Sequence, residues 1–275
     1  MREQVFGGEF FCPQATLLCG QVFRYRPFER GYLVFTKDKA CYIYAEGGKV
    51  HILSEDEEYF YNYFDLSRGY AKIADFAASC GIPAVAAAAE YGKGIHILRQ
   101  DAEETFFSFI ISQNNRIPRI RGIIERIAES LGEEREFLGE RYFTFPNAAR
   151  LAQKDESFYA ALGAGYRAKY IAQTAERIAK EGLSPLAPLK GAKLRAKLAE
   201  YAGVGPKVAD CIALFGFADT AAFPVDTWIE KAYREDMGGT LKKREEISAY
   251  FSEKFGEYGG FMQQYLFYYK RGRRE

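Results

Sequence analysis

The residue with the clearest chemical potential is Lys207, which directly follows the turn Gly203-Val-Gly-Pro206. The pattern places Lys207 in the first turn of a helix, where the helix dipole disfavours a cation by about 0.3–1 kcal/mol. Such a lysine is either simply exposed to solvent, or it has a lowered pKa that lets its amine act as a nucleophile. The residue alone leaves both interpretations open.

A second candidate, Asp226, ends the segment Phe223-Pro-Val-Asp226 and precedes a predicted helix from Thr227 to Arg234. An aspartate at this position could simply be the N-cap of that helix, with no further role. The same cap would also hold a carboxylate rigidly enough to direct it at a reacting group. Taken singly, Lys207 and Asp226 each have an ordinary structural explanation.

The elements that must position these residues are two short helices joined by the glycine turn. Apolar residues recur at helical spacing on both sides of it: Leu194, Leu198 and Tyr201 before the turn, and Val208, Ile212 and Phe215 after it. Gly203 and Gly205 let the backbone pass close to a partner, and amides at a helix N-terminus suit a phosphate. Ordinary helix–helix turns also contain glycine, so the turn alone does not identify a binding site.

The predicted secondary structure changes from strands to helices near residue 55. Its 275 residues suit one or two domains, and 48% hydrophobic residues are enough for a sizeable core. From Gly20 to Leu53, aromatic and branched residues separated by turns at 37–39 and 46–48 predict an antiparallel sheet. After Glu55 helical patterns dominate, and the last two helices are predicted at 242–256 and 259–271.

Charge and cysteine usage exclude several classes of protein. Lys+Arg 38 against Asp+Glu 37 gives a net charge of +1, so the chain is not a uniformly basic nucleic-acid coat, although a local patch can still bind DNA. The five cysteines form no C-x-x-C pair, and only Cys211 lies in the last hundred residues, so we expect neither a zinc site nor an iron–sulfur cluster. No apolar run approaches the ~20 residues of a membrane helix, and the N-terminus lacks a signal-peptide pattern. We expect a cytoplasmic protein with no membrane partner.

The hairpin with its lysine, followed by Pro-Val-Asp, resembles the helix–hairpin–helix DNA glycosylases. Within them it is similar to the 8-oxoguanine DNA glycosylase/AP lyase family, which carries an N-terminal β domain. Further segments resemble that family in order, from about residue 17 to residue 270: Cys19-Gly-Gln-Val-Phe-Arg-Tyr25, Tyr63-Phe-Asp-Leu66, Leu98-Arg-Gln-Asp101, Phe107-Ser-Phe-Ile-Ile-Ser-Gln-Asn-Asn115, Leu162-Gly-Ala-Gly-Tyr-Arg-Ala-Lys-Tyr170 and Tyr258-Gly-Gly-Phe-Met-Gln-Gln-Tyr-Leu-Phe267.

The resemblance implies an α+β fold, with an N-terminal antiparallel β domain and a two-lobed helical body that holds the active cleft between its lobes. We expect the β-rich domain over residues 1–98. One helical lobe would comprise 99–146 and 240–275, and the lobe over 147–239 would carry the helix–hairpin–helix.

The same resemblance implies excision of 8-oxoguanine from double-stranded DNA by a monomer that needs no catalytic cofactor. A base inside a duplex has to be flipped into a pocket before it can react. Lys207 would form a Schiff base with the sugar and lead to β-elimination, while Asp226 would steady developing positive charge or help deprotonate the amine.

Substrate selection would follow from four pocket residues. Gly20 would offer its carbonyl to the N–H at position 7 of the oxidised purine, where normal guanine has a bare acceptor. Phe267 and Cys211 would cover the two faces of the base, and Gln263 would read its Watson–Crick edge.

Other residues would hold the DNA or the hairpin. Asn114 would enter the gap left by the flipped base, Tyr166 would wedge the stack, and Arg119 and Arg167 would face the orphaned cytosine. For each arginine a solvated helix face or a phosphate contact is an equal alternative. Further DNA contacts are expected at Gly203, Gly205 and Trp228, and a structural monovalent cation or calcium at the backbone carbonyls of Ala199, Tyr201 and Val204.

The sequence departs from the family pattern at several positions. Trp228 stands where animal members have histidine, and Arg116 and Pro118 replace the small or amide residues of the Asn-rich loop, so the local reading of DNA there is open. Two other functions compete with the one implied. The chain could be a glycosylase for another damaged base, or a non-catalytic DNA-binding module. Lys207 argues against the monofunctional glycosylases, because they need no amine nucleophile.

Overall fold

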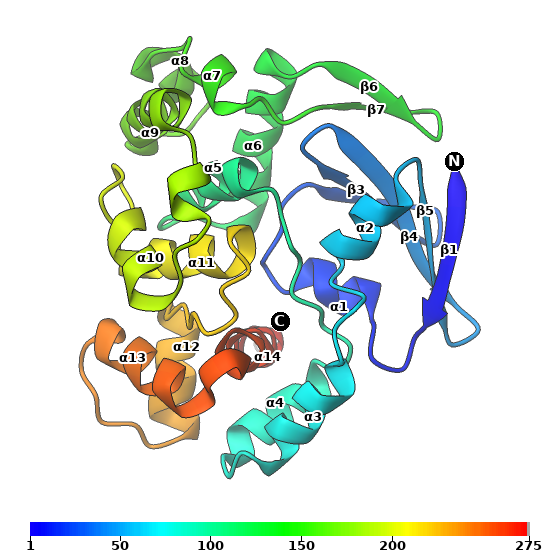
Figure 1. Cartoon of the computed structure of the whole chain (residues 1–275), viewed down its shortest axis with the longest axis vertical. Coiled ribbons are helices and arrows are strands. Elements are labelled where there is room, and N and C mark those ends of the chain that lie inside the picture. Colours follow the sequence, from blue (N-terminus) through cyan, green and yellow to red (C-terminus); the bar gives the residue numbers. More distant parts are fainter. Residues whose placement is uncertain (274–275) are drawn as a thin grey trace.

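The computed structural model describes residues 1–273, and its N-terminal part is a five-stranded antiparallel sheet in the order β1-β5-β4-β3-β2 (Figure 1). The strands are β1 (Arg2–Gly7), β2 (Tyr25–Phe28), β3 (Gly31–Thr36), β4 (Lys39–Glu46) and β5 (Lys49–Ser54). Both predicted hairpin turns are confirmed, because Thr36 pairs with Lys39 and Glu46 pairs with Lys49. Strand β1 was not predicted, since its side chains are mostly exposed at the sheet edge and carry little periodic signal.

A helical body follows the sheet, as predicted. It consists of α2 (Glu57–Tyr63), α3 (Tyr70–Ser79), α4 (Pro83–Tyr91), α5 (Ala102–Ser112), α6 (Ile117–Leu131), α7 (Ala148–Leu151), α8 (Glu156–Ala161), α9 (Arg167–Glu181), α10 (Gly191–Leu198), α11 (Pro206–Gly216), α12 (Thr227–Lys231), α13 (Arg244–Phe255) and α14 (Gly259–Gly272). One further helix, α1 (Pro13–Leu18), lies between β1 and β2 in the chain and was not predicted. Helix α12 is shorter than predicted, because a π-helical turn, Ala232–Asp236, takes over from it.

A charged hairpin, β6 (Glu134–Phe137) and β7 (Glu140–Phe143), was also missed by the sequence analysis. Only Phe137 and Tyr142 of its eight residues are buried, so the sequence shows no alternation of apolar residues that would predict these two strands. The hairpin packs beside α6, and the buried Phe35 ring stacks on Tyr142 with their centroids 4.9 Å apart.

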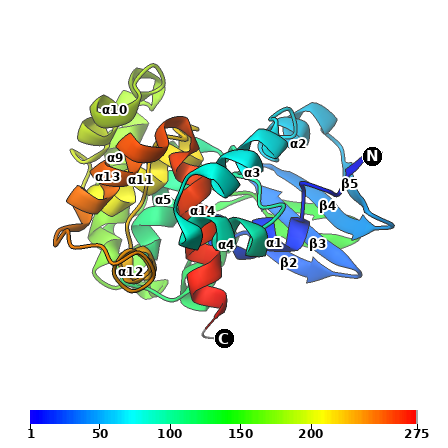
Figure 2. The same ribbon diagram turned by 90° about the horizontal axis from the view of Figure 1, so that it is seen from below.

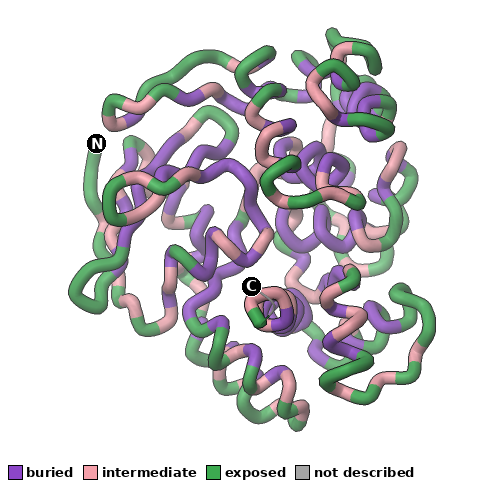
Figure 3. The backbone as a smooth tube through the Cα atoms, turned by 180° about the vertical axis from the view of Figure 1, so that it is seen from behind, coloured by how far each residue is buried: buried purple, intermediate pink, exposed green. Residues whose placement is uncertain are grey.

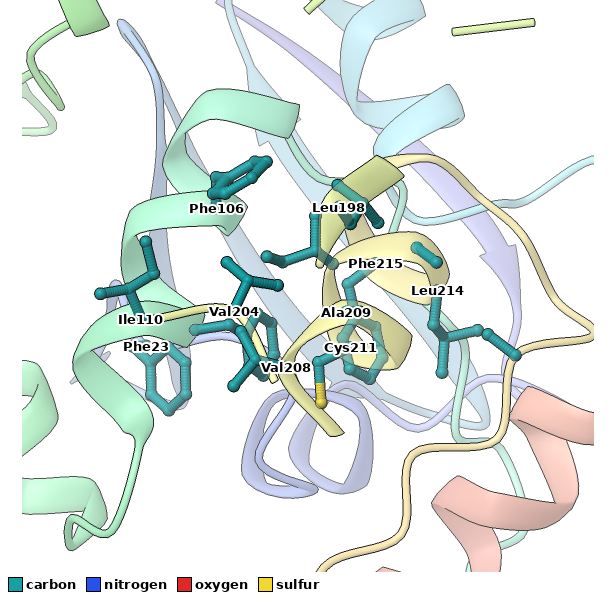
Figure 4. Close-up of a cluster of buried hydrophobic side chains, with 14 of the residues drawn as sticks. Phe23, Phe106, Ile110, Leu198, Val204, Val208, Ala209, Cys211, Leu214 and Phe215 are labelled. Carbon is teal, nitrogen blue, oxygen red and sulfur yellow. The ribbon is translucent and has the colours of Figure 1, made fainter. Parts of the chain in front are cut away.

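The main core lies where α5, α10 and α11 pack together. Every apolar residue used to predict the two-helix unit is buried there, from Leu194 on α10 to Phe215 on α11. Figure 4 shows Phe106 and Ile110 of α5 facing Val208 and Ala209 of α11. Figure 3 shows that buried residues run through these central helices, whereas the peripheral loops are exposed. This packing fixes α11, and with it the start of the helix that carries Lys207.

The C-terminal helix α14 lies between two parts of the helical body. It packs against α4 on one side and against α12 and α13 on the other (Figure 2). Among residues 1–273, no helix combines the length and the apolar character that a membrane span requires.

Candidate active site

Lys207 is the second residue of α11 and is only partly exposed. Pro206 begins the helix, where its missing N–H costs nothing, and Gly205 serves as the N-cap without a side-chain hydrogen bond. The ammonium nitrogen of Lys207 lies 5.4 Å from the ring centre of Phe109 on α5. The side chain is therefore held over an aromatic face at the helix start instead of extending into solvent.

The surroundings of Lys207 favour its charged form. Burial lowers the pKa of Lys207, but the nearby Cys211, Asp226 and Asp210 outweigh burial, so its pKa is raised from the ordinary value. Burial also raises the pKa of the Cys211 thiol to about 11, although Lys207 opposes the shift. Neither alternative from the sequence holds in the free protein, because Lys207 is neither simply exposed nor lowered in pKa.

Asp226 is the N-cap of α12, as predicted. Its Oδ1 accepts hydrogen bonds from the backbone N–H groups of Trp228 and Ile229, each at 2.9 Å. The cap fixes the carboxylate, and Asp226 lies near enough to Lys207 for its charge to raise the pKa of the amine. A role of Asp226 as the cap of α12 is thus compatible with a role of its carboxylate in the chemistry.

The predicted pocket residues fall on three elements. Gly20 follows α1 with φ of +82°, a conformation that favours glycine, and a methyl group there would lie 3.0 Å from Cε1 of Phe267. The structure thus brings Gly20 and Phe267 together, although they are far apart in the sequence. Cys211 lies on α11 one turn after Lys207, and Gln263 is buried on α14 one turn before Phe267. The side-chain oxygen of Gln263 accepts a hydrogen bond from Gln264 at 2.8 Å.

A second group of predicted residues surrounds the loop between α5 and α6. Asn114 is exposed with φ of +45°, and it lines an open hollow together with Asn115, Arg116 and Arg119. The guanidinium of Arg119 is exposed and donates to the carbonyl of Gly163 at 3.2 Å. Asn114 and Arg119 therefore share a face that is open to a partner.

Tyr166 and Arg167 meet the same loop from α9. Tyr166 is 53% exposed and its hydroxyl donates to the carbonyl of Gln113 at 3.3 Å. Arg167 is buried and donates to three carbonyls, those of Gln113, Asn114 and Ala164. In this structure the guanidinium of Arg167 supports the loop, so contact with an orphaned base would require these bonds to be exchanged.

The remaining predicted DNA contacts lie in the turn between α10 and α11 and at the start of α12. Gly203 has φ of +76° and packs against the ring of Tyr170, while Gly205 has open space around it. Trp228 is partly buried in the first turn of α12, and the ammonium of Lys231 lies 5.4 Å from its ring centre.

Two residues near these groups were missed by the sequence analysis. Phe109 underlies Lys207, but nothing distinguishes it within its aromatic run. Arg271 lies beside Gly20 and Phe267, and its position one helical turn after Phe267 repeats the spacing of Gln263 and Phe267. That spacing could have identified it.

Comparison with known proteins agrees with this geometry. Residues 107–257 match the model of the HhH-GPD superfamily of base excision DNA repair proteins, and residues 6–106 match the N-terminal domain of 8-oxoguanine DNA glycosylase. The N-glycosylase/DNA lyase OGG1 of Arabidopsis thaliana is 36% identical over 193 residues, which cover 65% of this chain and about half, 53%, of that protein. A probable N-glycosylase/DNA lyase of Methanothermobacter thermautotrophicus is 31% identical over 241 residues, 80% of this chain and 75% of the relative.

The same likeness extends to solved structures. The 8-oxoguanine glycosylase/lyase of Clostridium acetobutylicum, in complex with double-stranded DNA containing cytosine opposite 8-oxoguanine, superposes with a TM-score of 0.91. It is 37% identical, and the match covers 97% of this chain and 94% of that one. A 3-methyladenine DNA glycosylase from Archaeoglobus fulgidus shares the fold at 17% identity and a TM-score of 0.79. The chain therefore belongs to the HhH-GPD superfamily of base excision DNA repair proteins and carries the N-terminal domain of the 8-oxoguanine DNA glycosylases.

Proposed function

We propose that this chain excises 8-oxoguanine from duplex DNA and then cleaves the strand, as a bifunctional DNA glycosylase/AP lyase. The observation that carries the proposal is the placement of Lys207 at the start of α11, one turn before Cys211 and within the electrostatic influence of the capped carboxylate of Asp226. An amine and a carboxylate fixed in this way suit nucleophilic catalysis at a carbon that develops positive charge.

The proposed chemistry uses the amine of Lys207. After losing its proton, the amine attacks the sugar carbon of the N-glycosidic bond and the damaged base leaves. The sugar ring then opens to a Schiff base, and removal of a neighbouring proton expels the 3′ phosphate by β-elimination. Asp226 stabilises the positive charge that develops on the sugar, or takes up the proton that Lys207 loses.

Recognition of the base rests on Gly20 and its neighbours. We propose that the Gly20 carbonyl accepts the N7–H of 8-oxoguanine, so normal guanine presents acceptor to acceptor and is rejected. One buried unmade hydrogen bond is worth about 1–3 kcal/mol, which cannot supply all of the selectivity. Phe267 and Cys211 would enclose the faces of the base, and the buried Gln263 would read its Watson–Crick edge.

Double-stranded DNA is the proposed partner, bound by one copy of the chain. The exposed Asn114 would fill the gap left by the base and the exposed Tyr166 would wedge the adjoining stack. Amides at Gly203 and Gly205 would bind phosphate, and Trp228 would contact the strand nearby.

We also propose that the carbonyls of Ala199, Tyr201 and Val204 bind a structural monovalent cation or calcium. The Tyr201 carbonyl accepts one hydrogen bond, from the amide of Val204 at 3.1 Å, which leaves a second lone pair available. Replacing choline with potassium or calcium at constant ionic strength should raise the melting temperature if the ion binds, and identical melting temperatures would refute the site.

Borohydride trapping tests the main proposal. Only an enzyme that forms a Schiff base becomes covalently attached to 8-oxoguanine duplexes on reduction, so a non-catalytic binding module would leave the DNA free. Duplexes that contain alkylated purines or adenine mismatches serve as controls for another base specificity. Lys207→Gln should abolish both excision and trapping yet keep lesion binding, and wild-type-like strand cleavage by this variant would remove Lys207 as the nucleophile.

A further inference from the structure

Arg271 extends from the last turns of α14 toward the loop that contains Gly20. Its Nη2 donates to the carbonyl of Leu18 at the end of α1, and its guanidinium carbon lies 5.4 Å from the ring centre of Phe267. Its other terminal nitrogen, Nη1, lies 3.4 Å from the point that a methyl group on Gly20 would occupy. Arg271 thus lies beside both residues that are proposed to hold the base.

The Nη1 nitrogen of Arg271 is unusual because it lacks an acceptor. It is buried, and no hydrogen-bond partner exists for it among residues 1–273. Leaving a charged donor buried without an acceptor is costly. Nη2 is satisfied by Leu18, so the side chain is anchored while one donor remains free beside Gly20.

We propose that Nη1 of Arg271 donates a hydrogen bond to a carbonyl oxygen of the flipped base, next to the N7–H that Gly20 accepts. The inference rests on the proposed function. It adds a specificity-determining residue to the pocket, with a role distinct from that of Gln263.

The hydrogen-bonding pattern of the oxidised base fits this pair. In 8-oxoguanine the N7–H is flanked by two carbonyl oxygens, one at C6 and one at C8. The protein places the Nη1 donor of Arg271 beside Gly20, whose carbonyl is the proposed acceptor for the N7–H. The Gly20 carbonyl would accept the N7–H of the base, and Nη1 of Arg271 would donate to the neighbouring oxygen at C6 or at C8.

The test compares Arg271→Met with wild type under single-turnover conditions. Methionine keeps a flexible apolar stem against Phe267 but has no N–H donor. Arg273→Met is the matched control, because Arg273 is an exposed arginine on the same terminal segment that bonds Tyr269. Each protein is assayed for excision of 8-oxoguanine and for strand cleavage at a preformed abasic site, which has no base to recognise.

Loss of one charged donor should slow 8-oxoguanine excision roughly 10- to 100-fold, while abasic-site cleavage changes less than about twofold. Arg271→Lys, which retains a charged donor, should recover part of the loss. An equal loss on both substrates would reduce Arg271 to a structural contact, and an unchanged excision rate would also overturn the inference. Failure of wild type itself to excise 8-oxoguanine would instead refute the proposed function.

A second substrate identifies the oxygen. 8-Oxoadenine keeps the oxygen at C8 and carries an amino group at C6. If the C8 oxygen is the acceptor, Arg271→Met should slow excision of both bases by a similar factor. If the C6 oxygen is the acceptor, the variant should lose preference for 8-oxoguanine over 8-oxoadenine.

Discussion

Lys207 has two requirements that conflict, because an amine must be neutral to attack and its neighbours hold it charged. Asp226 contributes to this charge, since its carboxylate raises the pKa of Lys207. The rate of excision should therefore rise with pH as the ammonium loses its proton. The Asp226 carboxylate makes it harder for Lys207 to lose its proton, but it would also stabilise the positive charge that later develops on the sugar.

Asp226→Asn separates these effects. The amide oxygen of asparagine can still accept from the N–H groups of Trp228 and Ile229, so the free energy of unfolding should change by well under ~1 kcal/mol. Excision should fall by roughly 10²–10³-fold because the charge is lost. The rise of rate with pH should also move to lower pH, since the pKa of Lys207 falls.

Single-turnover rates across pH, with thermal unfolding of the same proteins, measure all three effects. If activity and stability both stay near wild type, Asp226 is only a helix cap.

At the scale of elements, the hairpin depends on one of its two glycines for shape. Gly203 has φ of +76°, and a methyl group there would lie 2.4 Å from Cδ2 of Tyr170 on α9. Gly205 has a β-region conformation with nothing within 4 Å of a methyl group. The two glycines are alike in sequence but differ in structural demand.

Gly203→Ala should therefore lower the free energy of unfolding by more than ~1 kcal/mol and weaken DNA binding. Gly205→Ala should lower the free energy of unfolding by less than ~1 kcal/mol, because alanine is a poorer N-cap than glycine but fits the extended backbone there without a clash. Chemical denaturation of the two variants decides the matter. Equal destabilisation would show that the strain at Gly203 is not the controlling feature.

The loop that ends α5 should set the preference for the base opposite the lesion. Arg119 is exposed beside Asn114, whereas Arg167 uses its donors on the loop backbone. An unpaired cytosine offers O2 and N3 as acceptors for arginine donors. Each such contact is worth about 1–3 kcal/mol, so cytosine should lead the other three bases by about tenfold or more.

Excision rates on four duplexes that differ only opposite the lesion test this expectation, with Arg119→Ala as the variant that should remove it. Equal rates on all four would leave Arg119 as a phosphate contact. In that case Arg119→Ala should weaken binding uniformly and reduce its dependence on salt.

These elements also show how far sequence reasoning reaches. Hairpin turns, the buried faces of α10 and α11, the position of Lys207 and the cap at Asp226 all depend on local spacing, so they were predictable. Strand β1 and the β6–β7 hairpin carry few buried side chains and gave no periodic signal. The raised pKa of Lys207 and the contact of Arg271 with Gly20 depend on residues brought together only by folding.

At the scale of the whole molecule, one buried charge network joins the sheet to the helices. Arg24 lies just before β2, its side chain is 1% exposed, and it lies 3.7 Å from carboxylate oxygens of both Glu104 on α5 and Glu125 on α6. Glu104 also accepts from the backbone N–H of Lys37 at 2.6 Å. Removing one partner of such a buried pair destabilises the fold, so Arg24 helps to fix the β domain against the helical body that carries Lys207.

Glu104 of this network, and Asp210 on α11 outside it, should make stability depend on pH. Burial raises the pKa of Glu104 to about 7 although Arg24 opposes the shift, and burial likewise raises the pKa of Asp210 to about 7. Between pH ~4.5 and 7 the folded protein therefore binds more protons than the unfolded chain, and its stability falls as pH rises through this range. His96 acts in the opposite sense, because burial lowers its pKa to about 4, so its contribution is lost as pH falls below ~6.5.

The melting temperature should accordingly fall by several degrees between pH ~5 and ~7, because each kcal/mol corresponds to roughly 2–4 °C in a chain of this size. Glu104→Gln should flatten this fall, since glutamine imitates the protonated acid and can still accept from the N–H of Lys37. Glu129→Gln, an exposed change on α6, is the matched control and should keep the wild-type slope. A slope that Glu104→Gln leaves unaltered would show that Glu104 stays ionised throughout and that Arg24 outweighs its burial.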